Sequence, residues 1–261
     1  MTAPVYLINL PRDTQRLAVM RQQLQAQHLP FEWVQAVYGK DLSEAQRAAL
    51  YDARANAARY HQVMTPGEIG CYASHLNVWQ RIAEGSAPFA LVLEDDVELL
   101  PQLPAVLQSV AALPPRWDMI KLVGREREKP WQRWTLPSPA AGTALIRYRR
   151  PPSLTGAYLV SREGAAKLLA AHKPFYRPID VDLRHWWCSG LRLYGLSPYP
   201  ISLGEESFVS SIGQRELGHW WSRRWRKARG QWAYNFRNAW ANLQLSRQGD
   251  PFPELKNNHE A

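Results

Sequence analysis

The sequence contains little cysteine, and its two cysteines, Cys71 and Cys188, lie far apart in the chain. Two cysteines cannot form the multiple disulfide bonds typical of small secreted domains. Their wide separation also differs from the close ligand spacing of structural zinc sites. We therefore expect a protein of the reducing cytoplasm, stabilised by its hydrophobic core.

Long apolar runs and glycine-rich phosphate motifs are also absent. No run approaches the roughly 18 apolar residues that a membrane-spanning helix requires. Residues 5–10 are apolar but follow no basic segment, so a signal peptide is not expected. The sequence contains neither GxGxxG nor GxxxxGK[ST], which excludes the usual dinucleotide and P-loop phosphate sites.

Candidate strands and helices alternate along the 261 residues, which predicts an α/β fold. The strand-like segments are residues 5–10, 31–37, 89–93, 117–124, 143–148, 153–160 and 191–196. The helix-like segments are residues 13–27, 43–60, 65–85, 99–113 and 161–169. We expect Asp13 to cap the first helix, residues 143–148 to form an edge strand, and the charged residues 125–142 to form a loop.

Three consecutive carboxylates, Glu94, Asp95 and Asp96, follow the apolar run at residues 89–93. In open α/β sheets, ligands bind where the strands end. Residues two apart in an extended chain point the same way, so Glu94 and Asp96 can face one cation while Asp95 points elsewhere. Since Mg²⁺ and Mn²⁺ prefer oxygen ligands, we predict a divalent metal site at Glu94 and Asp96. The alternative is a solvated acidic turn.

A second carboxylate pair, Asp180 and Asp182, follows a proline-punctuated loop and lies at an expected helix start. Before both acidic clusters in the chain, Thr65 and Glu68 have the spacing of a capping box at the start of a helix. His75 of this helix falls outside its apolar stripe, together with Cys71 and Ser74. A histidine at such a position is more often a packed or solvated side chain than a catalytic group.

Acidic residues are absent from residues 217–249, whereas seven basic residues there supply most of the net charge of +9. Apolar residues recur in this segment at helical steps: Trp221, Trp225, Ala228, Trp232, Phe236, Ala239 and Leu243. The pattern predicts an amphipathic helix over residues 217–247, of the kind that adsorbs to anionic membranes. The alternative is a terminal helix packed on its own protein. Nucleic acid is not expected, because no recognised binding motif accompanies the basic residues.

Six blocks of the sequence carry a family resemblance: VYLINLPRDTQR, GEIGCYASH, ALVLEDDV, WDMIKLVG, TGAYLVSREGAAKLL and PIDVD. With these blocks in this order, the chain resembles glycosyltransferase family 25, the bacterial lipo-oligosaccharide glycosyltransferases related to collagen galactosyltransferases. The resemblance implies a GT-A-type fold and a UDP-galactose or UDP-glucose donor. It further implies inversion at the anomeric carbon and a lipo-oligosaccharide acceptor.

Such a transfer needs a base for the acceptor hydroxyl and a cation for the leaving diphosphate. Asp180 or Asp182 is the predicted base, and Mn²⁺ or Mg²⁺ the predicted cofactor. The resemblance implies donor-binding positions of three kinds. They are polar residues near the first strand, which solvation alone would also explain, residues of the matching blocks, and one serine beyond them. They are Asn9, Arg12, Arg16, Glu68, His75, Glu94, Asp95, Thr155, Gly156 and Ser211.

The expected organisation is a GT-A-like catalytic domain over residues 1–212 and a basic, Trp-rich tail over residues 213–261. Its function would be metal-dependent transfer of galactose or glucose to a lipid-linked or other glycan acceptor at the inner face of the cell membrane. A competing hypothesis is a non-catalytic basic module that binds membrane or nucleic acid. In that case both carboxylate clusters are structural.

Overall fold

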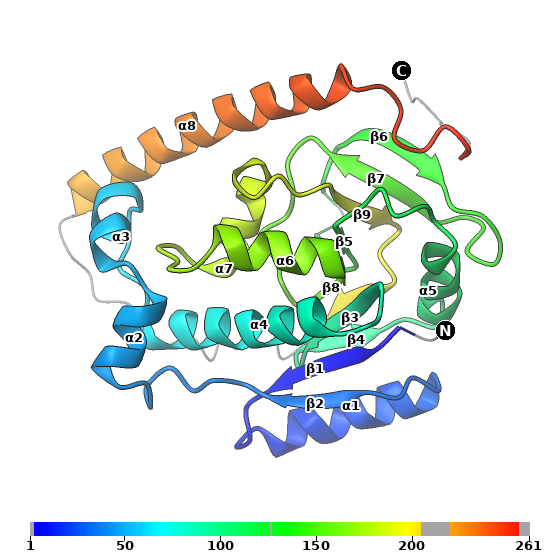
Figure 1. The fold of residues 1–261 in the computed structure, drawn as a ribbon, viewed down its shortest axis with the longest axis horizontal. Coiled ribbons are helices and arrows are strands. Elements are labelled where there is room, and N and C mark those ends of the chain that lie inside the picture. The colour runs from blue at the N-terminus through cyan, green and yellow to red at the C-terminus, as the bar shows by residue number, and fades with distance from the viewer. Residues whose placement is uncertain (1–2, 126, 205–219, 256–261) are drawn as a thin grey trace.

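The computed structural model describes residues 3–125, 127–204 and 220–255, and for residues 220–226 only the helical backbone. An eight-stranded mixed sheet runs through the molecule in the order β2-β1-β3-β8-β5-β9-β7-β6 (Figure 1). Its strands are β1 (Val5–Asn9), β2 (Glu32–Gln35), β3 (Phe89–Glu94), β5 (Met119–Lys121), β6 (Pro130–Thr135), β7 (Ala144–Tyr148), β8 (Ala157–Ser161) and β9 (Leu193–Ser197). A separate antiparallel pair joins β4 (Val97–Leu99) to β10 (Ile201–Leu203).

Helices cover both faces of the sheet. They are α1 (Thr14–Ala26), α2 (Glu44–Leu50), α3 (Ala53–Arg59), α4 (Pro66–Glu84), α5 (Leu103–Ala111), α6 (Arg162–Ala171), α7 (Ile179–Asp182), the 3-10 helix η1 (Leu183–Cys188) and α8 (Trp220–Ser246). The core on one face contains residues of α1 and α5, and the core on the other contains residues of α4 and α6. The alternation of β3 explains this division, since Leu91 and Leu93 lie in the first core and Val92 in the second. No helix within the described ranges is long and apolar enough to cross a bilayer.

The site is positioned by the parallel part of the sheet. β1 pairs in parallel with both β2 and β3, so the carboxyl ends of these strands meet at one edge. Asn9 ends β1 and Glu94 ends β3. β8 then runs antiparallel between β3 and β5. The sheet therefore brings Asn9 and Glu94 together although they are far apart in sequence.

The sequence predicted most of these elements, but it missed β4 and β10, and four further local expectations are wrong. Asp13 stands at the start of α1 but its side chain makes no capping hydrogen bond. Residues 43–60 form two helices, because the chain extends at Tyr51, where it pairs with Phe175. Residues 125–142 are not all loop, since they contain β6. β7 is consequently an inner strand between β9 and β6 rather than an edge strand.

Helix α4 differs most from its predicted environment. The capping box is confirmed, with Thr65 and Glu68 each accepting from the other's backbone N–H. Ser74 and His75, expected outside the apolar stripe, are instead buried. Ser74 Oγ accepts from the backbone N–H of Val37 at 2.8 Å, in the segment after β2. α4 is thus enclosed by the sheet, by α6 and by this segment.

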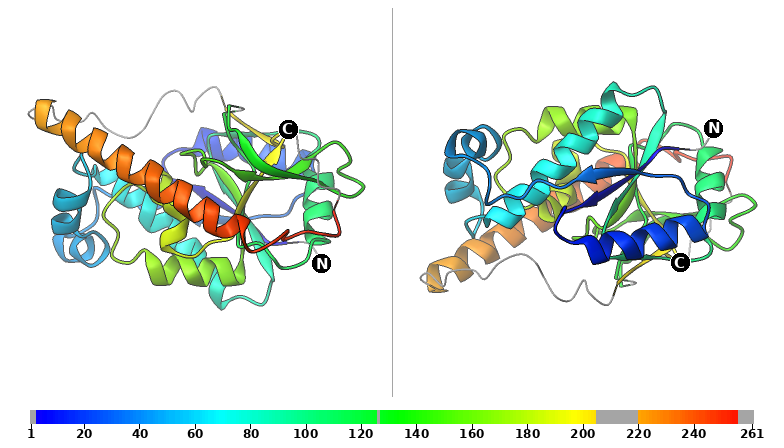
Figure 2. Two further views of the ribbon diagram at one scale, coloured as in Figure 1. Left: turned by 90° about the horizontal axis from the view of Figure 1, so that it is seen from above. Right: turned by 90° about the horizontal axis from the view of Figure 1, so that it is seen from below.

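The predicted C-terminal helix is present as α8, which lies along the outside of the molecule next to η1 (Figures 1 and 2). Tyr234, Asn238 and Ala241 of α8 are buried against the body. Farther on, Phe252 is fully buried in the core that also contains α1 and α5. The expected division at residues 212 and 213 lies outside the described residues, but the described part of the tail packs into both cores.

Candidate active site

A cavity of about 260 Å³ lies at the edge where β1 and β3 end. Its walls come from the turn after β1, the segment after β2, the start of α4 and the acidic cluster after β3. Six of the residues predicted to bind the donor line this first cavity: Asn9, Arg12, Arg16, His75, Glu94 and Asp95. Ser211, another residue predicted to bind the donor, lies outside the described residues.

Asp95 is held by the turn that follows β1. Asn9 Nδ2 donates to Asp95 Oδ2 at 2.6 Å, and the Arg16 guanidinium lies 3.4 Å from Asp95 Oδ1. Burial raises the pKa of Asp95, which these two partners oppose. Asp95 therefore links the acidic cluster to β1 and α1.

Glu94 and Asp96 are the carboxylates left to face a cation. Burial, together with the charges of Glu94 and Asp95, raises the pKa of Asp96 to about 7. Such a shift means that negative charge is poorly compensated at this point of the structure. Two carboxylates offer the oxygen donors that Mg²⁺ and Mn²⁺ prefer, so the donor set fits the predicted metal.

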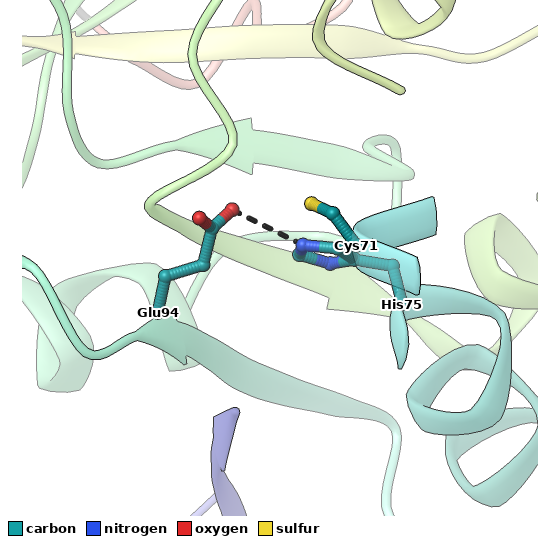
Figure 3. A group of neighbouring side chains, drawn as sticks. All are labelled: Cys71, His75 and Glu94. Carbon is teal, nitrogen blue, oxygen red and sulfur yellow. Dashed lines mark hydrogen bonds and ion pairs between the residues drawn. The ribbon is translucent and has the colours of Figure 1, made fainter. Parts of the chain in front are cut away.

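Glu94 also belongs to a tight group with Cys71 and His75 of α4 (Figure 3). Among the described residues, these three are the group of potential metal ligands whose ligand atoms lie within 4.8 Å of one another. Burial and the neighbouring Glu94 raise the pKa of the Cys71 thiol well above its usual value. The contact between His75 Nε2 and Glu94 Oε1 within this group orients the Glu94 carboxylate.

A buried hydrogen-bond chain fixes that orientation. Trp79 Nε1 donates to the Tyr158 hydroxyl oxygen at 2.8 Å, and the Tyr158 hydroxyl lies 2.7 Å from His75 Nδ1. His75 Nε2 lies 3.1 Å from Glu94 Oε1. The consistent assignment has Tyr158 donating to Nδ1 and His75 donating from Nε2 to Glu94. Although burial acts to raise it, the hydrogen bond from His75 lowers the pKa of Glu94 and keeps it ionised.

Sequence reasoning missed Tyr158 and Trp79 in this chain. Trp79 follows His75 by one helical turn, so their common face was readable from the sequence. Tyr158 comes from β8, and its approach to α4 depends on the antiparallel insertion of β8 beside β3. Nothing in the local sequence indicates that insertion.

A second cavity of about 550 Å³ adjoins the first and shares Cys71, Glu94 and Asp96 with it. Four other predicted site residues line this second cavity: Glu68, Thr155, Gly156 and Asp180. Gly156 is closely packed, since a Cβ there would lie 2.9 Å from Val97 Cγ1. Glu68, Thr155 and Gly156 thus line the second cavity and not the first.

Asp180 and Asp182 have different surroundings. Asp180 lines the second cavity, and burial raises the pKa of its carboxyl. Asp182 is buried and accepts hydrogen bonds from Tyr72 at 2.6 Å, from His172 at 2.7 Å and from Arg177. The geometry assigns Asp180 to the cavity and gives Asp182 the role of anchoring α7.

Next to the second cavity lies a basic hollow, which shares Arg125 and Ser153 with it. The hollow is lined by six basic side chains and one described acidic side chain: Arg125, Arg127, Lys129, Arg149, Arg150, Arg184 and Glu128. Glu128 accepts from the backbone N–H groups of Arg125 and Arg127. The hollow therefore presents a net positive charge beside the second cavity, which favours an anionic ligand.

These features define an α/β protein whose site lies at the carboxyl ends of parallel strands, with an acidic cluster between two cavities. The family model for glycosyltransferase family 25 (LPS biosynthesis protein) matches residues 2–183. The chain therefore belongs to glycosyltransferase family 25. The α/β fold with a C-terminal helix is confirmed by the structure, and its GT-A-type assignment follows from the family.

Curated relatives include procollagen galactosyltransferases. Procollagen galactosyltransferase 1-A of Xenopus laevis is 31% identical over 188 residues, which cover 68% of this chain and 30% of that protein. Human procollagen galactosyltransferase 2 is 31% identical over 186 residues, covering 68% of this chain and 29% of that protein. The chain thus spans about a third of the length of these relatives.

Two solved structures are similar to this fold at low sequence identity. One is a Drosophila β-1,4-galactosyltransferase 7 in complex with manganese, UDP-Gal and xylobiose, with a TM-score of 0.41 and 9% identity over 86% of this chain and 80% of that chain. The other is an active-site mutant of LgtC, with a TM-score of 0.41 and 11% identity over 87% of this chain and 95% of that chain.

Proposed function

We propose that the protein transfers a hexose, galactose or otherwise glucose, from a UDP-sugar to a glycan acceptor of the lipo-oligosaccharide kind, with inversion at the anomeric carbon. The observation that carries the proposal is the meeting of the two cavities at Glu94 and Asp96, with Asp180 in the wall of the second. One cavity would hold the nucleotide and the other the acceptor. Family membership and galactosyltransferase relatives support this assignment.

In the proposed reaction, the acceptor hydroxyl oxygen attacks the anomeric carbon while the bond to the UDP diphosphate breaks. The hydroxyl proton passes to the Asp180 carboxylate, and UDP leaves. A raised pKa brings a carboxylate closer to the operating pH and makes it a better general base. The basic hollow beside the second cavity supports an acceptor with an anionic group.

A divalent cation would be held by Glu94 and Asp96 and would neutralise charge on the leaving diphosphate. Asn9 and Arg16 would keep Asp95 away from it, and His75 would keep Glu94 ionised and oriented. The residues of the first cavity, among them Arg12, would contact the nucleotide. Arg12 already lies over the Tyr38 ring, at 4.2 Å from its centroid, so two side chains of this wall are held together.

The first test is a thermal shift with UDP in the presence and absence of Mn²⁺. Ligand binding to the folded state raises the melting temperature. UDP at 100 times its Kd should raise the free energy of unfolding of the protein by about 2.7 kcal/mol. We expect the shift to require Mn²⁺ and to be lost in Asp96→Asn. Full stabilisation of Asp96→Asn by UDP in excess EDTA would contradict the metal site.

A panel of UDP-sugars, with release of UDP as the readout, then identifies the donor. NMR of the product at the new anomeric carbon reports inversion or retention. Glycosyl transfer without any UDP-sugar preference, or with retained configuration, would overturn the proposed reaction. A non-catalytic basic module would show neither UDP release nor stabilisation by UDP.

A further inference from the structure

Helix α8 has two unlike faces, and the one that is packed on the protein is not its aromatic face. Tyr234, Asn238, Ala241 and Asn242 are buried. On the other side, Trp232 is 78% exposed, Phe236 73%, Trp240 54% and Leu243 42%. These four residues recur at helical steps along one stripe, here called the aromatic face. α8 is therefore packed on its own protein, as the predicted alternative has it, but through the face opposite to these four residues.

Polar contacts explain why the opposite face is packed. Asn238 Nδ2 and Asn242 Nδ2 both donate to the backbone carbonyl of Arg149, at 2.6 and 3.2 Å. Asn238 Oδ1 accepts from Trp186 Nε1 at 3.3 Å, in η1. The Tyr234 ring lies beside His185, with ring centroids 5.0 Å apart. Because these contacts fix the rotation of α8, they leave the aromatic face directed away from the body.

The surroundings of the aromatic face are positively charged. Arg229, Arg237 and Arg247 of this segment are exposed. Helical spacing places Arg229 on the aromatic face and Arg237 at its flank, and Arg247 directly follows the last residue of α8. Residues 217–249 contain no acidic residue that could neutralise them. Exposed Trp and Phe flanked by Arg are the combination that inserts into the headgroup region of an anionic bilayer.

We propose that the aromatic face of α8 binds an anionic lipid surface, with Trp232, Phe236 and Trp240 in the headgroup region and the arginines on the lipid phosphates. A second copy of this chain is a poor occupant, because two such faces would bring together basic segments that have no acid to pair with. Nucleic acid is disfavoured because the centre of the face is apolar and its charges lie at the flanks.

The same helix also borders the site. Lys227 of α8 lines the second cavity, which is the proposed acceptor side. Adsorption through the aromatic face would therefore hold that cavity close to the bilayer, where a lipid-linked acceptor is presented. The delivery of the acceptor to the second cavity rests on the proposed function, whereas adsorption of α8 to the lipid surface does not.

The test is co-sedimentation of the full chain with vesicles of a neutral phospholipid alone or mixed with an acidic phospholipid. Because both side chains are exposed, the pair Trp232→Ser and Phe236→Ser should leave thermal unfolding unchanged. Their loss should lower partitioning onto acidic vesicles by about tenfold or more. Trp131→Ser is the matched control, since Trp131 is also exposed, at 41%, but lies on β6.

Charge is tested separately with Arg229→Gln, Arg237→Gln and Arg247→Gln together. Each removed charge should weaken binding to acidic vesicles about fivefold at low salt, with little effect on neutral vesicles. The matched control neutralises three exposed arginines elsewhere: Arg21→Gln, Arg54→Gln and Arg162→Gln.

Equal pelleting of the wild type and the Trp232→Ser, Phe236→Ser variant would overturn the proposal. Retention on single-stranded nucleic acid without binding to vesicles would overturn it in favour of a nucleic-acid surface. A dimer that the same variant converts to monomer, with no vesicle binding by either, would assign the face to a second copy. UDP release by the variant with a soluble acceptor separates these outcomes from a failure of the proposed function.

Discussion

Asp180 and Asp182 are two residues apart and yet differ in chemistry, because one faces a cavity and the other is enclosed by donors. Asp182 accepts from Tyr72, whose ring stacks on Phe175 at a centroid distance of 3.9 Å. Both aspartates were predicted as candidate bases from sequence alone. Their side chains could be told apart only after the loop before α7 had folded over α4.

The first prediction concerns the proposed base. Asp180→Asn keeps the size of the side chain and removes its basicity, so turnover should fall by about 10² or more. Donor binding, measured as stabilisation by UDP with Mn²⁺, should remain, because Asp180 does not line the first cavity. Normal turnover of Asp180→Asn would exclude it as the base and direct attention to Glu68 in the same cavity wall.

The second prediction concerns Asp182 and pH. Although burial opposes the effect, the hydrogen bond from His172 and the charge of Arg177 hold the pKa of Asp182 well below its usual range. A depressed folded pKa stabilises the protein above the unfolded value of about 3.9, and the contribution is lost as pH falls below it. Asp182→Asn should therefore lower the free energy of unfolding by about 3 kcal/mol or more at pH 6.

Urea denaturation at several pH values measures this difference. The difference in the free energy of unfolding between wild type and Asp182→Asn should become smaller as pH is lowered below about 4. If this difference in free energy stayed constant down to pH 2, the ionised carboxylate would not be the stabilising species.

At the scale of elements, α4 carries much of the site, and its position depends on two glycines. A Cβ on Gly70 would lie 2.4 Å from the carbonyl oxygen of Val37 and 2.6 Å from the backbone nitrogen of Gly39. The segment after β2 therefore crosses the first turns of α4 at backbone contact distance. This crossing places Cys71 and His75 at the wall of the first cavity.

The third prediction follows from that crossing. Gly70→Ala should destabilise the protein by about 3 kcal/mol, because the backbone of the crossing segment must move. The matched control is Gly230→Ala, also within a helix, where nothing lies within 4 Å of the added Cβ. That substitution should stabilise by up to about 1 kcal/mol, since alanine favours a helix. Thermal unfolding of both variants checks the opposite signs.

The sequence could predict the features that local patterns determine, but not those that depend on contacts between distant residues. The capping box at Thr65 and Glu68 and the carboxylates after β3 are local, and the structure contains both. The burial of His75 and the presence of β6 depend on partners far along the chain, which no local pattern specifies. For α8, the steps of Trp and Phe predicted the helix, but the docked face is decided by two asparagines that bind Arg149.

For the whole molecule, the segment after α8 is part of the core. The Phe252 ring lies 5.5 Å from the Trp134 ring and 5.4 Å from the Tyr194 ring, between centroids. Asp250 accepts from Trp134 Nε1 at 2.8 Å. The described tail is thus bound to the sheet at both α8 and Phe252, so deleting it would disturb the fold as well as any membrane binding.

The fourth prediction tests this integration. Phe252→Ala should lower the free energy of unfolding by about 3–5 kcal/mol, because it leaves a cavity in the core. Val63→Ala, at a side chain that is 76% exposed, is the control and should change it by less than about 0.5 kcal/mol. Chemical denaturation followed by fluorescence and by circular dichroism should give coincident transitions. A separate early transition for the tail would show that it unfolds independently, and would contradict its integration into the fold.

The strand order has a consequence for synthesis on the ribosome. β8 is inserted between β3 and β5, and β9 is inserted between β5 and β7. Each inserted strand is therefore translated after both of the strands that it joins. A nascent chain can pair β1, β2 and β3 early, but β3 keeps an open apolar edge until residue 161 has emerged, and β5 until residue 197. Such edges attract other chains. Translation between residues 94 and 197 is therefore the stage at which the growing sheet is most exposed to pairing with other chains.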